Sequence, residues 1–271
     1  MRKQFAWSQR RPKEAGRVPA VHRTRGGWQH NAPLFAGMLI MRFVVVGAQG
    51  VVAGKTLSAP VREAEAAVAR EFTGQTGAEG FPLDAAWQSA PAIQFFSDWQ
   101  GKNADPERET EVRLLWSQTA LYVRFLAHFR SITVFENAEA NGRRDELWER
   151  DVAEVFLQPS GSDGMRYKEF EVSPNGFWID LDIAPGKKRD LASGLKRRVN
   201  VDEKRKIWTA ELILPMKSLT QDFDPAKEWR VNFFRVEGAS ESRFYSAWQA
   251  TGTPAPNFHV PEAFGKLVFE K

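Results

Sequence analysis

The chain of 271 residues contains no cysteine and only four histidines. Without cysteine there can be no disulfide, no thiolate metal site, no thiol nucleophile and no lipid-modified cysteine. The sequence also lacks a P-loop, an HExxH motif and a Gly-x-Ser-x-Gly motif, which argues against a P-loop nucleotide site, a zinc protease and a serine hydrolase. A folded body without disulfides must be stabilised by its core, and 20 Phe and 10 Trp supply the side chains for one.

Acidic residues are almost absent from the first 60 positions, where Glu14 is the single acid. The formal net charge of +4 therefore comes from this basic leader, and the remainder of the chain is net acidic. A nucleic-acid-binding domain would carry its basic residues on the folded body. We therefore expect no nucleic-acid partner.

The leader itself falls into two segments. Residues 1–37 are rich in Arg, Gly, Pro and Gln without apolar periodicity, which predicts a disordered segment or an extension caused by a wrongly assigned start codon. Residues 38–54 are a short apolar run that ends in small residues, too short for a comfortable membrane span. This run looks like a secretory signal peptide cleaved near Ala48 or Ala53, although an Arg-rich leader is also compatible with an organellar transit peptide. We expect export to the periplasm or the extracellular space, without a stable membrane span.

The rest of the chain predicts strands. Residues 55–79 are expected to form a linker or a short helix, because 61–71 are rich in Ala, Glu and Arg. From residue 80 to residue 271, short apolar and alternating runs are separated by turn residues at regular intervals. This pattern predicts an all-β fold, an antiparallel β-sandwich or jelly roll. Residues 187–206 carry nine Lys and Arg, which predicts a solvated loop or a contact for an anionic glycan, lipid surface or nucleic acid.

One predicted strand carries a carboxylate among apolar residues. In the stretch 148–159, the alternation places Val152, Glu154 and Phe156 on one face. Glu154 is costly to bury unless another residue pairs with it or a polar ligand meets it. The structural alternative is that an arginine holds Glu154 and that Trp148 belongs to the core.

Two further carboxylates alternate in the next strand, where Glu169 and Glu171 share one face. A polar face that crosses several strands can present acceptors to sugar hydroxyls, as lectin-like sandwiches do. The same pattern is typical of the solvent side of an antiparallel sheet. A third interpretation makes two of these carboxylates the acid and base of a glycosidase.

The C-terminal stretch combines an aromatic, amides and prolines before the last strand. Prolines on both sides can hold Phe258 rigidly for binding, or Phe258 can close the end of the sandwich. For Phe264, which is followed by a glycine and an apolar strand, we predict a packing role.

Residues 80–271 resemble carbohydrate-binding module family 9, the xylan- and cellulose-binding type. The resemblance is carried by Trp148-Glu149-x-Asp151-x-x-Glu154-Val155-Phe156, by Trp208-x-Ala210-Glu211-Leu212-Ile213-Leu214-Pro215 and by the closing Pro261-x-x-Phe264-Gly265-x-Leu267. It implies a sandwich that holds one sugar ring between two aromatic walls, with hydrogen bonds from polar side chains on the neighbouring strands. The residues that the resemblance assigns to this site are Trp148, Glu154, Glu169, Glu171, Asn257 and Phe258.

The sequence departs from the family pattern at two of these positions. Phe258 stands where the family places a tryptophan, and Glu171 stands where it places an arginine. Structural Ca²⁺ occurs in the family, but the resemblance assigns no ligands for it here, and we predict no metal-binding residues. The fold is similar to haem-binding DOMON domains as well, for which His128, Met165 and Met216 would be the axial-ligand candidates.

Together these observations predict an exported, non-catalytic domain that binds an oligo- or polysaccharide and requires no cofactor. The alternatives are an enzyme that acts on glycosidic bonds through Glu154, Glu169 and Glu171, a haem-binding domain, or a scaffold domain of the same fold.

Overall fold

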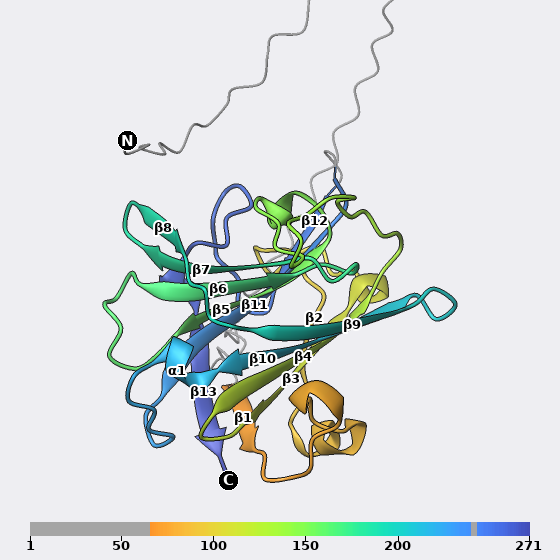
Figure 1. The fold of residues 1–271 in the computed structure, drawn as a ribbon. Helices are drawn as coiled ribbons and strands as arrows, with labels where there is room; N and C mark the ends of the chain where they lie inside the picture. The colour runs from red at the N-terminus through yellow and green to blue at the C-terminus, as the bar shows by residue number, and fades with distance from the viewer. Residues whose placement is uncertain (1–65, 240–242) are drawn as a thin grey trace, which may run out of the picture. The chain divides into compact units, whose positions relative to one another are not determined.

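The computed structural model describes residues 66–239 and 243–271 (Figure 1). The chain divides into two units, residues 1–58 and 59–271, and all the described residues belong to the second. The predicted N-terminal extension at 1–37 and the predicted signal peptide at 38–54 lie outside the described residues. Within 66–239 and 243–271, no helix is long and apolar enough to cross a membrane.

Most of the regular structure in the described residues is strand, as the sequence predicted. The strands are β1 (Ala67–Glu71), β2 (Ile93–Phe95), β3 (Thr110–Trp116), β4 (Ala120–His128), β5 (Val152–Gln158), β6 (Tyr167–Val172), β7 (Trp178–Ala184), β8 (Lys187–Asp190), β9 (Lys196–Asp202), β10 (Ile207–Pro215), β11 (Trp229–Glu237), β12 (Phe244–Ala247) and β13 (Gly265–Glu270). The helical elements are short: α1 (Met216–Leu219), η1 (Ala78–Gly80), η2 (Asp84–Ser89), η3 (Pro106–Arg108), η4 (Leu147–Glu149) and η5 (Pro261–Ala263).

All these strands are linked in one curled sheet, in the order β8-β7-β6-β5-β11-β13-β1-β3-β4-β10-β9, with β12 added to β11 and β2 added to β3. Its two halves face each other in Figure 1, with β5, β6, β7 and β11 in one half and β3, β4, β9 and β10 in the other. This arrangement confirms the predicted β-sandwich. Most neighbours are antiparallel, but β1 pairs in parallel with both β13 and β3, so the sheet is mixed.

Strand β1 corrects the predicted helix. Residues 67–71 form a strand between β13 and β3, and Ala67 and Ala69 are completely buried. The local Ala, Glu and Arg content favours a helix, but the hydrogen bonds available between two partner strands outweigh that weak preference. The domain therefore begins before residue 80.

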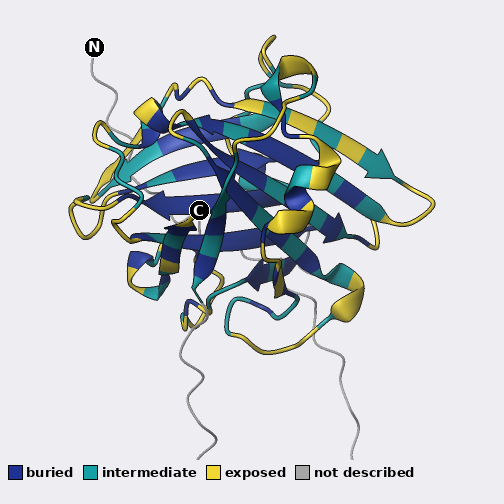
Figure 2. Cartoon of the chain, turned by 90° about the horizontal axis from the view of Figure 1, so that it is seen from below, coloured by how far each residue is buried: buried dark blue, intermediate teal, exposed yellow. Residues whose placement is uncertain are grey.

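The main core lies between the two halves. The faces of β5 and β6 that carry Val155, Leu157 and Phe170 pack there with Trp208 and Leu212 from the opposite half. The central strands are mostly buried, and the connecting loops carry most of the exposed residues (Figure 2). Because successive side chains alternate between faces, the residues next to these in sequence must point away from this core.

The basic segment at 187–206 is not the loop that the sequence predicted. It contains β8 and β9, which are the two ends of the sheet order. End strands expose unpaired backbone groups, and charged side chains on them oppose pairing with another chain. Some of these cations also form ion pairs, because Arg198 donates from Nε to Glu211 at 3.0 Å and Arg189 contacts Asp182 at 2.5 Å.

Candidate functional site

Three carboxyl groups gather on the face of β5 and β6 that points away from the main core. The register places Glu154 directly opposite Glu171, and Phe156 directly opposite Glu169. The three side chains therefore share one face, as the alternation predicted. Each is only 1–2% exposed, so this face is not the solvent side of the sheet. Aromatic and aliphatic side chains surround them, among them Phe156, Tyr167, Ile179 and Phe234.

The oxygen atoms of these carboxyls are unusually short of hydrogen-bond donors. Oε1 of Glu154, Oε2 of Glu169 and both oxygens of Glu171 are buried and accept no hydrogen bond from the residues that the structure describes. The predicted structural arginine for Glu154 is not found among those residues. Buried polar atoms are nearly always paired, and an unpaired one costs about 1–3 kcal/mol. Four unpaired acceptors in one place therefore form a buried polar group that would gain from a ligand with donors.

Burial and mutual repulsion shift the acid–base properties of this group. Burial raises the pKa of Glu154 well above its ordinary value, and the nearby charge of Glu169 adds to the effect. Burial, followed by the charges of Glu154 and Glu169, also raises the pKa of Glu171 well above the ordinary range, while Lys188 opposes the shift. The protonated form is therefore favoured, and a protonated Glu171 can donate to the carboxylate of Glu169.

The neighbouring tyrosine belongs to the same group. Burial raises the pKa of the Tyr167 hydroxyl, and the charges of Glu169 and Glu154 add to this effect. The hydroxyl of Tyr167 shares a hydrogen bond of 2.5 Å with Nδ1 of His259. The same Nδ1 lies 3.8 Å from Oε2 of Glu169. His259 thus connects the C-terminal loop to the carboxyl group cluster.

Trp148 lies in η4, immediately before β5, and is half-buried at the edge of this aromatic cluster. The ammonium nitrogen of Lys188, which comes from the end strand β8, lies 3.7 Å from the centroid of the Trp148 ring. Lys188 also lies close enough to Glu154 and Glu171 to favour their charged forms. One face of the Trp148 ring, which the resemblance assigns to the sugar site, is thus covered by the ammonium group of Lys188.

Phe258 lies over β11, beside the carboxyls. Its ring stacks on Phe234 with a centroid distance of 4.2 Å and an interplanar angle of 14°, and it is only 9% exposed. Because Phe234 is the register partner of Glu154, this stack adjoins the carboxyl group cluster. The neighbouring Asn257 is exposed, and its side-chain oxygen accepts a hydrogen bond from the backbone of His259. Phe264 is buried against Phe156 and Tyr167, which confirms its predicted packing role.

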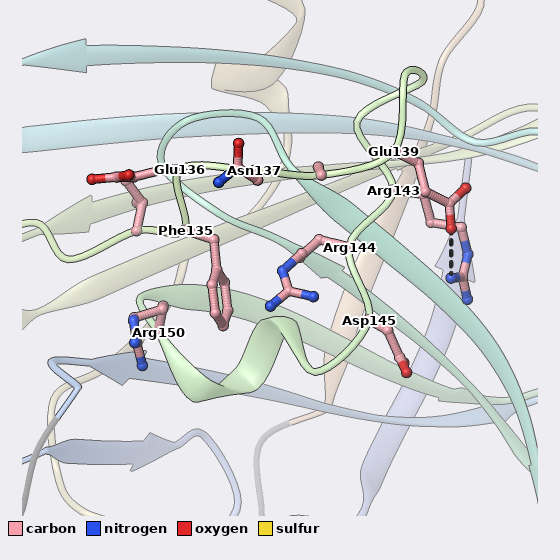
Figure 3. A pocket seen from close by; sticks show the side chains of 10 residues that line it. Phe135, Glu136, Asn137, Glu139, Arg143, Arg144, Asp145 and Arg150 are labelled. Atoms are coloured by element: carbon pink, nitrogen blue, oxygen red, sulfur yellow. Dashed lines mark ion pairs between the residues drawn. The ribbon is translucent and has the colours of Figure 1, made fainter.

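A separate hollow of about 660 Å³ lies in the loop that precedes η4 and is lined by residues 134–139, 143–145 and 150. Figure 3 shows the Phe135 ring between two guanidinium groups, those of Arg144 at 4.0 Å and Arg150 at 4.8 Å from its centroid. An ion pair between Arg143 and Glu139 closes one side of the hollow. None of the sequence-predicted site residues lines it.

The fold and this site can be compared with known proteins. The family model described as carbohydrate family 9 binding domain-like matches residues 80–271. The chain belongs to this family. An extracellular protein of Arthroderma benhamiae is 25% identical to the family-9 domain over 181 residues, which are 60% of this chain and 80% of the relative.

Solved structures share the fold of this family-9 domain. A candidate carbohydrate-binding protein from Bacteroides uniformis aligns with a TM-score of 0.59 and 17% identity, over 75% of this chain and 98% of its own. A carbohydrate-binding module of family 9 from Caldicellulosiruptor kristjanssonii, solved with cellotriose, aligns with a TM-score of 0.53 and 14% identity, over 76% of this chain and 94% of its own. The structure of such a module from the same organism with glucose aligns with the same TM-score. The family and the β-sandwich predicted from the sequence are thus confirmed.

Metal and haem sites have no comparable support in the family-9 domain. Among the residues that the structure describes, no group of three or more His, Asp or Glu side chains is arranged to hold a metal ion. The Ca²⁺ ion of the family stays a prediction for this chain, since Ca²⁺ also binds backbone carbonyls and water. Of the haem-ligand candidates, Met216 is buried in the main core, Met165 is exposed in the β5–β6 loop and His128 ends β4.

Sequence reasoning missed several members of the site. Tyr167 could have been found, because it alternates with Glu169 and Glu171 on the same strand face. From the sequence, Lys188 belongs only to a basic segment. Its position over Trp148 could not be predicted, because it depends on the pairing of β7 with β8. The Phe234–Phe258 stack likewise joins two residues that no local pattern connects.

Proposed function

We propose that this family-9 domain binds a carbohydrate without cleaving it, at the site formed by Glu154, Glu169 and Glu171 beside Trp148 and Phe258. The observation that carries the proposal is the group of buried carboxyl oxygens that lack donors. A sugar ring provides several hydroxyl donors at short spacing, and hydrogen bonds from hydroxyls to carboxylates are stronger than those between neutral groups. The complexes of related modules with cellotriose and glucose support the same ligand class.

The aromatic residues support stacking of the sugar. The apolar C–H face of a pyranose packs well on an aromatic ring, and Trp148 packs against the hydrophobic cluster on the carboxyl-bearing face of the sheet. In the free protein Lys188 covers one face of that ring, so a sugar that stacks there must displace the lysine. Asn257, which is exposed next to Phe258, can add a hydrogen bond from the opposite side.

The arrangement of the carboxyls favours binding over hydrolysis. Glycosidases place two carboxyls on either side of the scissile bond, about 5–9.5 Å apart. Here the three carboxyls project from the same face of two adjacent strands, and the charges of Glu154 and Glu169 act on Glu171. They would meet one side of a sugar together, which suits recognition rather than attack from opposite faces.

We also propose that the domain is exported. The basic leader with its short apolar run, and the naming of the Arthroderma relative as an extracellular protein, both support this location. N-terminal sequencing of the mature protein tests it. A new N-terminus near residues 48–54 is expected, and an intact leader on the mature protein would contradict export.

Calorimetric titration of the protein with glucose, cellotriose and xylotriose tests the binding function. Trp148→Ala should abolish binding, because it removes the stacking surface. Trp178→Ala is a matched control, since Trp178 is also half-buried with a guanidinium, that of Arg197, over its ring at 5.2 Å, but packs toward the main core. Release of reducing ends from the oligosaccharides would overturn the non-catalytic proposal. An equal loss of binding in Trp148→Ala and Trp178→Ala would show that Trp148 is not part of the binding site.

A further inference from the structure

The charge balance of the site points to a particular kind of sugar. The groups that face one another there are Glu154 on β5, Tyr167, Glu169 and Glu171 on β6, Lys188 on β8 and His259 on the C-terminal loop. Three carboxyls thus face one lysine and one histidine, and four carboxyl oxygens are buried without a donor. A neutral sugar would supply donors but would leave the excess of acidic groups uncompensated.

On the basis of the proposed function, we propose that the site selects amino sugars, whose ammonium group is held by Glu154, Glu169 and Glu171 beside the Trp148 ring. An ammonium offers three N–H donors and a positive charge at one point. It therefore satisfies buried carboxylates better than a hydroxyl, which offers one donor and no charge. An N-acetylated sugar lacks the charge and adds bulk in the same place.

Lys188 marks the place of that ammonium in the free protein. Its nitrogen lies over the Trp148 ring and near Glu154 and Glu171, which is the combination of aromatic face and carboxylates that recognises cations. Lys188 comes from an exposed end strand on a flexible stem, and among the described residues it makes no ion pair within 4.0 Å. A ligand ammonium that replaces it would break the contact with the Trp148 ring but no ion pair among the described residues.

Binding of a cation should also release protons. The burial and crowding of Glu154 and Glu171 favour their protonated forms, and a bound ammonium favours the ionised forms. Affinity for an amino sugar should therefore rise as the pH increases, until the ligand amine itself loses its proton. Affinity for a neutral sugar should not rise, because it brings no charge that favours ionisation.

The test compares three trisaccharides with the same β-1,4 linkage that differ only at C2: the trimer of glucosamine, the trimer of N-acetylglucosamine and cellotriose. Isothermal titration of the full chain in two buffers of different ionisation enthalpy measures both affinity and proton release. We expect the glucosamine trimer to bind at least about tenfold more tightly than cellotriose, with proton release. We expect Glu171→Gln to reduce this preference, and Lys188→Met to increase the affinity for the amine.

The outcomes separate the two proposals. If cellotriose binds as tightly as the glucosamine trimer, the amino-sugar inference is wrong and carbohydrate binding stands. If none of the trimers binds, the proposed function itself fails. Glu203→Gln removes an exposed carboxylate paired with Lys206 and is the control for nonspecific attraction. A preference that survives in Trp148→Ala, or falls equally in Glu203→Gln, would overturn the inference.

Discussion

Replacing Glu171 with glutamine should weaken the dependence of protein stability on pH. The pKa values of Glu154 and Glu171 are raised in the folded protein, so both groups hold protons there that the unfolded chain loses above about pH 4.5. The stability that they contribute is complete below that pH and is lost as the pH rises toward their folded pKa values. Each such group lowers the free energy of unfolding by about 1.4 kcal/mol per pH unit in this range.

Both carboxyls contribute to the slope in the same direction, and Glu171→Gln, which removes one of them, should reduce their joint contribution by about half. Urea denaturation at several pH values between about 5 and about 7 measures the slope. Glutamine has nearly the same shape as protonated glutamate, so the fold should be retained. Other titrating groups, including Asp151, contribute equally to both proteins and cancel in the comparison.

The control is Glu203→Gln, whose carboxylate is exposed and should leave the slope unchanged. Parallel curves for the wild type and Glu171→Gln would show that Glu171 ionises as readily in the folded protein as in the unfolded chain. That result would refute the proton-sharing carboxyl group cluster described above.

Three other variants test separate parts of the structure. Burial raises the pKa of Asp151 to about 6 from 3.8, so its contribution of about 3 kcal/mol to the free energy of unfolding is lost as the pH rises across that interval. Asp151→Asn should remove this pH-dependent step from the stability profile. An unchanged profile would contradict the pKa shift. Phe233 is fully buried between the two halves, so Phe233→Ala should lower the free energy of unfolding by about 3–5 kcal/mol. A loss below about 1 kcal/mol in urea denaturation would contradict its place in the core. Lys188→Met should destabilise the fold by no more than about 1 kcal/mol, since an exposed lysine over a half-buried aromatic ring contributes little. A larger fall in melting temperature than this implies would show that Lys188 is a structural residue.

The strand faces could be read from the sequence because strand periodicity is local. Val152, Glu154 and Phe156 alternate with apolar residues on the opposite face, and the register confirms that they lie together. The same reasoning placed Glu169 and Glu171 on one face. The motifs around Trp148 and Phe264 then identified the family, because they combine residues from the middle and the end of the domain.

Other features could not be read locally. Residues 67–71 have a helical composition, and only the parallel partners β3 and β13, about 45 and 200 positions further along the chain, make them a strand. The basic segment 187–206 gave no sign of two strands, because strands at the ends of the sheet are exposed and carry charged side chains instead of the apolar alternation that predicts a strand.

By itself, the sequence determined the fold class, the family and the carboxylates that share a strand face, since each depends on a repeating pattern or a motif. The tertiary structure decided that Glu154 stands opposite Glu171, that Lys188 reaches the Trp148 ring and that Phe258 stacks on Phe234. These contacts join segments whose relative positions depend on strand register and sheet closure. Burial of the three carboxyls, and with it the raised pKa values of Glu154 and Glu171, follows from that packing and from no single stretch of the chain.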